Sequence, residues 1–333
     1  MKRIPALDGL RAVAIAMVFA YHVDKGVVPA GYWGVILFFV LSGYLITRVL
    51  VAGKERNGGI DLRTFYSHRA LRLFPALTVV CLALIITGTD WLTVLPALGH
   101  YANFARIDGF DLGLLTHTWF LAVLLHFYLL WPLVIAAVPA RHRLRAIGAI
   151  ALAAIAWRVV AIGVMSEGWV YNATDTNAAA ILAGCYLAVA RPRTWAVGRW
   201  SVPALLALML FPAFGEEGNA FLWADFVAIG LATLAVQDAA LRRSWLALPP
   251  IVWLGTISYG LYLWHYVFLR SGVSAWLTVP LTIATAAASR YLLEEPLRRW
   301  QGRLEVRRLG ASTVAGTDAE DGASVRDAAQ PVV

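Results

Sequence analysis

Ten apolar stretches, most of them about as long as a lipid bilayer is thick, run through the 333-residue sequence. A helix that crosses the hydrocarbon core needs about 20 largely apolar residues. Only 14% of the residues are charged, against about a quarter in soluble domains. The sequence therefore predicts an all-α membrane protein with about ten transmembrane helices, and it excludes an ordinary soluble enzyme, a disordered protein and a nucleic-acid binder. The predicted spans are 5–24, 31–50, 71–89, 118–138, 146–165, 175–190, 201–214, 221–237, 251–270 and 275–293.

The basic residues of the loops predict how these spans are oriented. Twenty-one Lys and Arg residues fall on the side of the N-terminus, whereas the opposite side carries only Lys25, Arg106 and Arg270. Cytoplasmic loops of membrane proteins are enriched in Lys and Arg. We therefore expect a multi-pass protein of the plasma membrane with both termini in the cytoplasm. The formal net charge of +8 reflects this bias and does not require a polyanionic partner.

A single membrane domain is expected over 1–303. Residues 304–333 are rich in Gly, Ala, Ser and Asp without periodicity, which predicts a disordered cytoplasmic tail. Cys81 and Cys185 lie inside apolar runs, so we expect small buried residues and not a disulfide or a metal pair. No H-x-x-x-H or H-E-x-x-H spacing occurs, so no bound metal is expected.

The first predicted span holds the ionisable residues Asp8, Arg11 and His22. Ionisable groups are costly inside a bilayer, so each is a candidate functional residue. Arg11 and His22 are eleven residues apart, which places them on one helix face and about 16 Å apart along the axis. We expect them to line one pore, with Arg11 near the cytoplasmic surface. The alternatives are an arginine that snorkels to the headgroups and an interfacial histidine at a helix end.

Arg69 and Arg72, in the next cytoplasmic loop, are at helical i, i+3 spacing, so their guanidinium groups face the same way. Two such groups suit phosphates. Ordinary anchoring at the cytoplasmic surface is the alternative. Arg158 and Arg290 lie within predicted spans, where each needs a partner or a route to the interface.

The other histidines of the outward half do not form a metal pair. His117 and His126 are nine residues apart, on opposite faces of the fourth span. His265 lies in a belt of Tyr and Trp in the ninth span. His100 lies in the longest outward loop, about 89–117, where we expect it to be solvated. The small residues of the second span, which allow close helix packing, are Gly31, Gly34, Ser42 and Gly43.

These segments, in this order, resemble the acyltransferase-3 family of integral membrane acyltransferases. The resemblance covers nearly the whole chain, from LDGLRA near residue 7 to EEPLRRW near residue 300. The matching pieces are the Arg11-to-His22 spacing, FFVLSGYLI, the Arg69 and Arg72 pair, the HTW…LAV…FYLLWP segment, SYGLYLWH and the Glu–Pro ending.

Family members move an acyl group from cytoplasmic acyl-CoA to a hydroxyl of an acceptor, often a sugar on the outer face. The resemblance implies that His22 is the catalytic histidine, acting as a general base or by way of a covalent acyl-histidine. It implies that Arg69 and Arg72 engage the CoA, and that Arg11 helps to bind or position the donor. The site candidates without an assigned role are Ser42, His117, His126, Asp175 and His265.

The resemblance also implies the partners of the reaction. Acyl-CoA, acetyl-CoA by default in the family, is the donor substrate, and no permanently bound cofactor is implied. The acceptor is a glycan, a lipid-linked sugar or a glycosylated small molecule. The protein lies in a lipid bilayer and binds no nucleic acid. A transporter or exporter of a small polar or acylated compound is the alternative function, because the same intramembrane charges can serve transport.

The chain departs from the family pattern at two places. The family usually has a Glu where this chain has Leu124 and Leu125, and commonly an Arg where it has Asn177. One hypothesis is a buried ion pair of the relatives that was lost as a unit here. The alternatives are a changed acceptor and lost activity. If another residue supplies the role of the Glu, the candidates are His126, Asp175 and Glu167.

Overall fold

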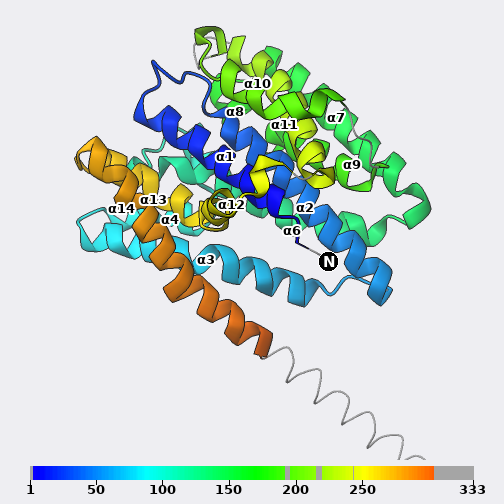
Figure 1. Cartoon of the computed structure of the whole chain (residues 1–333), viewed down its shortest axis with the longest axis horizontal. Coiled ribbons are helices and arrows are strands. Elements are labelled where there is room, and N and C mark those ends of the chain that lie inside the picture. Colours follow the sequence, from blue (N-terminus) through cyan, green and yellow to red (C-terminus); the bar gives the residue numbers. More distant parts are fainter. Residues whose placement is uncertain (1–2, 192–195, 215–219, 243, 304–333) are drawn as a thin grey trace, which may run out of the picture.

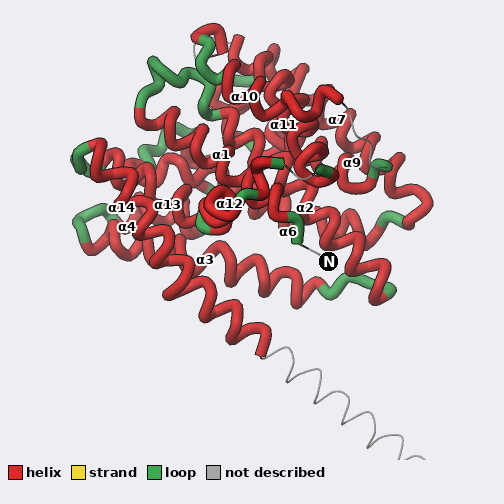
Figure 2. Tube along the Cα trace, in the orientation of Figure 1, coloured by secondary structure: helices red, strands yellow, loops and turns green. Residues whose placement is uncertain are grey.

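A computed structural model describes residues 3–191, 196–214, 220–242 and 244–303, and within these ranges the chain is a set of helices joined by loops (Figure 2). The predicted tail, 304–333, lies outside the described residues. The longer helices are α1 (Pro5–Val23), α2 (Trp33–Asn57), α3 (Leu62–Ile86), α6 (Trp119–Ala137), α7 (Arg143–Val164), α9 (Thr174–Val189), α11 (Ala220–Leu241), α13 (Ser258–Arg270) and α14 (Ala275–Ala288). The short helices are α4 (Trp91–Leu98), α5 (Ala102–Ile107), α8 (Glu167–Asn172), α10 (Ser201–Leu208) and α12 (Pro249–Thr256). Tight helical turns are η1 (Gly113–Thr118), η2 (Ala140–His142), η3 (Ala196–Trp200), η4 (Pro212–Phe214), η5 (Trp245–Ala247) and the π-helical η6 (Ser289–Glu294).

Each predicted apolar stretch falls on a helix or on a pair of consecutive helices. Six helical segments of the described chain are long and apolar enough to cross a membrane: Pro5–Val23, Trp33–Asn57, Leu62–Ile86, Gly113–Ala137, Ala140–Val164 and Ala220–Leu241. The other four predicted spans coincide with shorter helices, namely α9, α10, α12 with α13, and α14. A multi-pass helical membrane fold is therefore confirmed, while the count of ten spans stays a prediction.

The helix α1 lies in the middle of the bundle. Figure 1 shows α1 and α2 between a group formed by α7, α9, α10 and α11 and, on the other side, α3 and α14. The helix α1 packs against α2, α11, α12 and α13, and α2 packs most closely against α9. Because neighbouring helices surround α1, its polar side chains reach the interior of the protein, where lipid is excluded.

Small residues let these helices approach each other closely. Gly43 on α2 lies against the backbone carbonyl of Ile181 on α9, and Gly34 lies against the carbonyl of Ala14 on α1. A Cβ at either glycine would collide with the facing backbone. The predicted close packing is therefore confirmed at Gly34 and Gly43, whereas Ser42 lines a cavity.

The core also contains both cysteines. Cys81 and Cys185 are buried as free thiols, as the sequence predicts.

The predicted outward loop over 89–117 contains the helices α4 and α5 and the turn η1. These elements pack against α3, α6 and α13. The expectation that His100 is solvated is wrong, because its ring packs against Phe74 with the ring centroids 4.7 Å apart and only 2% of the residue is exposed. This burial lowers the pKa of His100, since water no longer stabilises the imidazolium. The same segment carries Arg106 and His117 into the interior.

Asp61 caps the N-terminus of α3. Its carboxylate accepts a hydrogen bond from the Thr64 hydroxyl at 2.7 Å and another from the Thr64 backbone N–H at 2.9 Å. These two bonds lower the pKa of Asp61. The stabilisation is thus present at neutral pH and is lost as the pH falls through the lowered pKa.

We expect Asp61→Ala to destabilise the folded protein by about 1 kcal/mol at neutral pH. The measurement is the thermal unfolding temperature in detergent. The control is Asp61→Asn, which keeps a capping oxygen. Its unfolding temperature should fall much less than that of Asp61→Ala. The difference between wild type and Asp61→Ala should narrow in acid, and an equal loss in both variants would argue against capping.

Candidate active site

Two cavities share the side chain of Tyr262, on α13, in their walls. The inner cavity lies beside the first turns of α1 and has a volume of about 240 Å³. The outer cavity lies beside the last turn of α1 and has a volume of about 80 Å³. The inner cavity holds Arg11, Ser42, Arg69 and Arg72, and the outer cavity holds His22 and His117. The four residues with a role implied from sequence therefore lie in two adjoining spaces.

Arginines give the inner cavity its chemical character. Arg69 and Arg72, one turn apart on α3, line it together with Arg11, and no Asp or Glu does so in the described chain. The Arg69 guanidinium lies over the rings of Phe65 and Tyr128, 5.5 Å from each centroid. Its buried Nε has no hydrogen-bond partner among the described residues. The shared face predicted from the i, i+3 spacing is confirmed, and the arrangement suits a phosphate group.

Arg11 connects the inner cavity with a larger open cavity of about 810 Å³ at the start of α1. Its Nη1 donates to the Asp8 carboxylate. Arg3 Nε donates to the same carboxylate at 2.6 Å. Arg11 is therefore held in the walls of two cavities by an ion pair, which is a different environment from an arginine that snorkels to headgroups.

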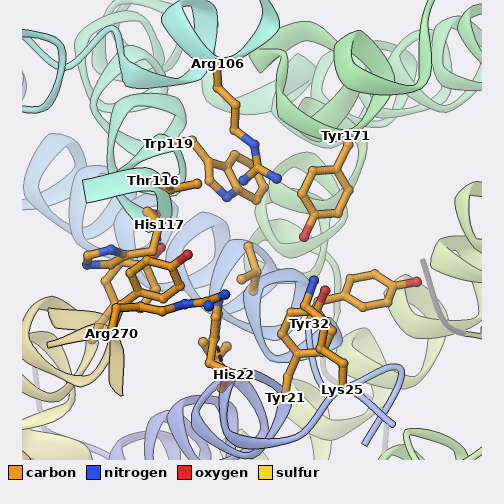
Figure 3. Close-up of a pocket in the computed structure, with 14 residues that line it drawn as sticks. Tyr21, His22, Lys25, Tyr32, Arg106, Thr116, His117, Trp119, Tyr171 and Arg270 are labelled. Carbon is orange, nitrogen blue, oxygen red and sulfur yellow. Dashed lines mark hydrogen bonds between the residues drawn. The ribbon is translucent and has the colours of Figure 1, made fainter. Parts of the chain in front are cut away.

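His22 lies in the outer cavity, and Figure 3 shows it facing a space also bordered by Arg106, His117 and Tyr171. Its Nδ1 is 2.8 Å from the backbone carbonyl of Val18. A carbonyl only accepts, so in the neutral ring Nδ1 carries the proton and Nε2 is the basic nitrogen. The rings of His265 and Tyr266 pack edge-on against it, each with its centroid 5.0 Å away. An imidazole held in this tautomer presents a basic Nε2, as a general base requires.

Two further histidines complete this region. The ring of His265 packs against the rings of both His22 and His117, with centroids 5.0 and 5.4 Å away. His265 is fully buried, and its Nδ1 is 2.7 Å from the carbonyl of Tyr262. The Tyr262 hydroxyl donates to the backbone carbonyl of His117. Residues from α1, η1 and α13 are thus locked together around the outer cavity.

Two sequence candidates lie elsewhere. His126 Nδ1, on α6, is 2.8 Å from the Thr174 hydroxyl, whereas His117 lies in the preceding turn η1 and lines the outer cavity. The Asp175 carboxylate accepts from the indole Nε1 of Trp157 at 2.8 Å and of Trp169 at 3.3 Å. Neither residue lines the inner or the outer cavity. Their polar atoms contact side chains of neighbouring helices, and the hypothesis that one of them supplies the role of the family Glu stays a prediction.

The two departures from the family pattern have different surroundings. Leu124 lines the inner cavity, where the arginines gather. Asn177 is buried near the start of α9, and its amide donates to the carbonyls of Tyr171 at 2.9 Å and Ala173 at 2.8 Å. Leu124 therefore forms part of the wall of the inner cavity, whereas Asn177 donates hydrogen bonds to backbone carbonyls outside it.

Sequence reasoning missed several residues that the structure makes prominent. Asp225 on α11 pairs with Arg158, with Arg158 Nη2 2.5 Å from Asp225 Oδ2. A lone acid in the eighth predicted span was the signal that could have indicated it. Arg290 pairs with Glu294 and Glu295 at 3.9 and 3.4 Å. The tyrosines of the outer cavity carry no local signal in the sequence; they are Tyr21, Tyr32, Tyr171, Tyr262 and Tyr266.

The fold and the two cavities define a multi-pass membrane protein that holds a histidine site and an arginine site in its interior. A family model described as an acyltransferase domain matches residues 4–289. The chain therefore belongs to this family of membrane acyltransferases, as its motifs indicate.

Three relatives illustrate the similarity. The chain is 31% identical to the peptidoglycan O-acetyltransferase OatA of Listeria monocytogenes, over 90% of this chain and 56% of the relative. It is 30% identical to the putative peptidoglycan O-acetyltransferase YrhL of Bacillus subtilis, over 89% and 55%. It is 29% identical to the O-acetyltransferase OatA of Staphylococcus aureus, over 89% and 57%. The chain thus spans just over half the length of these relatives. No solved structure gave a significant match.

Proposed function

We propose that this protein is a ten-span membrane O-acyltransferase, with both termini in the cytoplasm, that moves an acetyl group from cytoplasmic acetyl-CoA to a hydroxyl of a carbohydrate. The observation that carries the proposal is the adjoining pair of cavities, one lined by arginines and the other by His22. The acyltransferase family supports the reaction class. The names of the relatives support an acetyl group and a cell-wall glycan as acceptor.

The two cavities suit the two ends of an acyl-CoA molecule. The phosphates of CoA are anionic and match Arg11, Arg69 and Arg72 in the inner cavity. The pantetheine arm is thin and mostly uncharged, so it can follow the inner cavity towards Tyr262. Tyr262 lines both spaces and so borders the path by which the thioester would reach the outer cavity.

In the outer cavity His22 acts as the general base. Its Nε2 takes the proton of the acceptor hydroxyl while the hydroxyl oxygen attacks the thioester carbonyl carbon. When the tetrahedral intermediate collapses, the carbon–sulfur bond breaks and the CoA thiolate takes the proton from His22. The products are an O-acetyl ester and free CoA, and His22 returns to its neutral form.

Reconstitution in proteoliposomes tests this proposal. Labelled acetyl-CoA is supplied on one side of the membrane and a soluble cell-wall oligosaccharide on the other. We expect a base-labile acetyl ester on the oligosaccharide only when acetyl-CoA is on the side of the inner cavity. Movement of the oligosaccharide across the membrane without an ester would instead favour the transporter alternative.

Arg69→Gln and Arg72→Gln should each raise the KM for acetyl-CoA about tenfold, with a smaller effect on kcat. The reason is the loss of a charge-assisted hydrogen bond to phosphate, which contributes about 1.5–3 kcal/mol. The measurement is the initial rate against acetyl-CoA concentration. Acetyl-pantetheine, which lacks the phosphates, should be used equally well by wild type and variants. Arg63→Gln, an exposed arginine on the same helix, is the matched control. An unchanged KM in the two cavity variants would contradict phosphate binding by these arginines.

A further inference from the structure

His117 is the polar side chain of the outer cavity with the most unusual surroundings. It is 3% exposed, and neither ring nitrogen has a hydrogen-bond partner within the described chain. The carbonyls of Leu114 and Leu263 lie nearby without meeting hydrogen-bond geometry. A buried polar atom without a partner is unfavourable, because it has lost its hydrogen bonds to water. Such a group in a cavity wall indicates that its partner arrives with the substrate.

The ring of His117 is held in place from several sides. Tyr262 and Tyr266 flank it, with ring centroids 5.3 and 5.2 Å away, and His265 lies edge-on at 5.4 Å. Its backbone carbonyl accepts from the Tyr262 hydroxyl. A neutral imidazole has one N–H donor. The structure therefore holds the His117 ring in the wall of the cavity that His22 also lines, and in the neutral ring either nitrogen can carry the N–H proton.

We propose that this N–H group donates to the carbonyl oxygen of the thioester, so that His117 is the oxyanion donor of the reaction. The inference rests on the proposed function. As the acceptor oxygen forms its bond to the carbonyl carbon, the carbonyl oxygen gains the electron pair and the hydrogen bond from His117 strengthens. When the carbon–sulfur bond breaks, the electron pair returns and the carbonyl is restored. His117 keeps its proton throughout, and His22 carries the proton that moves.

The neighbouring histidine cannot fill this role. His265 Nδ1 lies 2.7 Å from the Tyr262 carbonyl, so it donates there and its Nε2 can only accept in the neutral ring. Arg106 and Arg270 also line the outer cavity, and each guanidinium lies over a tyrosine ring at 5.5 Å from the centroid. Lys25 also lines this cavity, with its Nζ 4.7 Å from the centroid of the Tyr21 ring. These three cations are the competing donors, and the experiment includes them.

The test is the steady-state kinetics of purified variants in proteoliposomes with acetyl-CoA and a soluble glycan. We expect His117→Leu to lower kcat about 10²–10³-fold, the cost of removing one oxyanion donor, while the KM for acetyl-CoA stays unchanged. His117→Gln, which keeps an N–H donor, should recover at least about tenfold of that loss. The dependence of kcat on pH should keep its shape, because His22 is intact. His126→Leu, on the helix α6 that follows η1 but outside both cavities, is the matched control and should match wild type.

Four results would overturn the inference. The first is a kcat of His117→Leu close to that of wild type. The second is a His117→Gln variant with a kcat as low as that of His117→Leu, which would indicate that His117 serves packing and not hydrogen bonding. The third is a larger loss of kcat in Lys25→Gln, Arg106→Gln or Arg270→Gln than in His117→Leu. In these three cases wild-type transfer stands, so the proposed function survives. The fourth is a wild-type protein that forms no ester. That result would overturn both the proposed function and the role of His117. A melting temperature for each variant separates loss of folding from loss of chemistry.

Discussion

Replacing His22 with Ala should lower kcat for acyl transfer by about 10²–10⁴-fold, the usual contribution of a general base. The Nδ1 of His22 is 2.8 Å from the Val18 carbonyl, so Nε2 is the basic nitrogen of the neutral ring, and His22 lines the outer cavity. The arginines proposed to bind the CoA phosphates lie in the inner cavity. We therefore expect the dissociation constant for acetyl-CoA to change little, so that the loss falls on the chemical step. Ester formation and acetyl-CoA binding are measured on the same reconstituted protein.

Two comparisons separate a missing base from a disturbed cavity. His22→Gln keeps a polar side chain but cannot take a proton, so it should be as inactive as His22→Ala. Added imidazole should restore part of the activity of His22→Ala, because it can enter the vacated space and accept the proton. A variant that retains kcat within about tenfold of wild type, outside the range for a general base, would place the base elsewhere.

Properties that depend on a few consecutive residues were predictable from the sequence. Each of the ten apolar stretches found by hydropathy falls on a helix or on consecutive helices, because apolar composition is a local property. The rigid geometry of a helix placed Arg11 and His22 on one face, and it set Arg69 beside Arg72. The structure confirms the second case, because Arg69 and Arg72 line the same cavity.

Properties that depend on packing between distant segments were not predictable. Arg11 and His22 do not line one continuous pore; they line two cavities, and Tyr262, from a helix more than 200 residues away, borders both. His100 is buried because α3 supplies Phe74 as its neighbour. The division of the predicted ninth span into α12 and α13 likewise reflects the packing of α12 on α1. No local pattern encodes which helix a side chain will meet.

The buried pair of Arg158 and Asp225 should control the stability of the bundle. These residues are 2% and 4% exposed, and Arg158 also donates to the Thr176 carbonyl at 3.2 Å. Removing one partner leaves an uncompensated charge in the interior, so Arg158→Leu or Asp225→Leu alone should each cost about 3–5 kcal/mol of folding free energy. The measurement is the free energy of unfolding in detergent.

The double variant, Arg158→Leu with Asp225→Leu, should be more stable than either single variant, because it removes both charges and leaves apolar side chains in their place. Arg298→Leu is the control, since its ion pair with Glu295, at 2.9 Å, is exposed and such pairs contribute about 0–1 kcal/mol.

Neither Arg158 nor Asp225 lines the inner or the outer cavity. The double variant should therefore keep the kcat of wild type at temperatures where it is folded. Additive losses in the double variant would show that the two charges do not compensate each other, and a lost kcat in a folded double variant would connect this pair to the reaction.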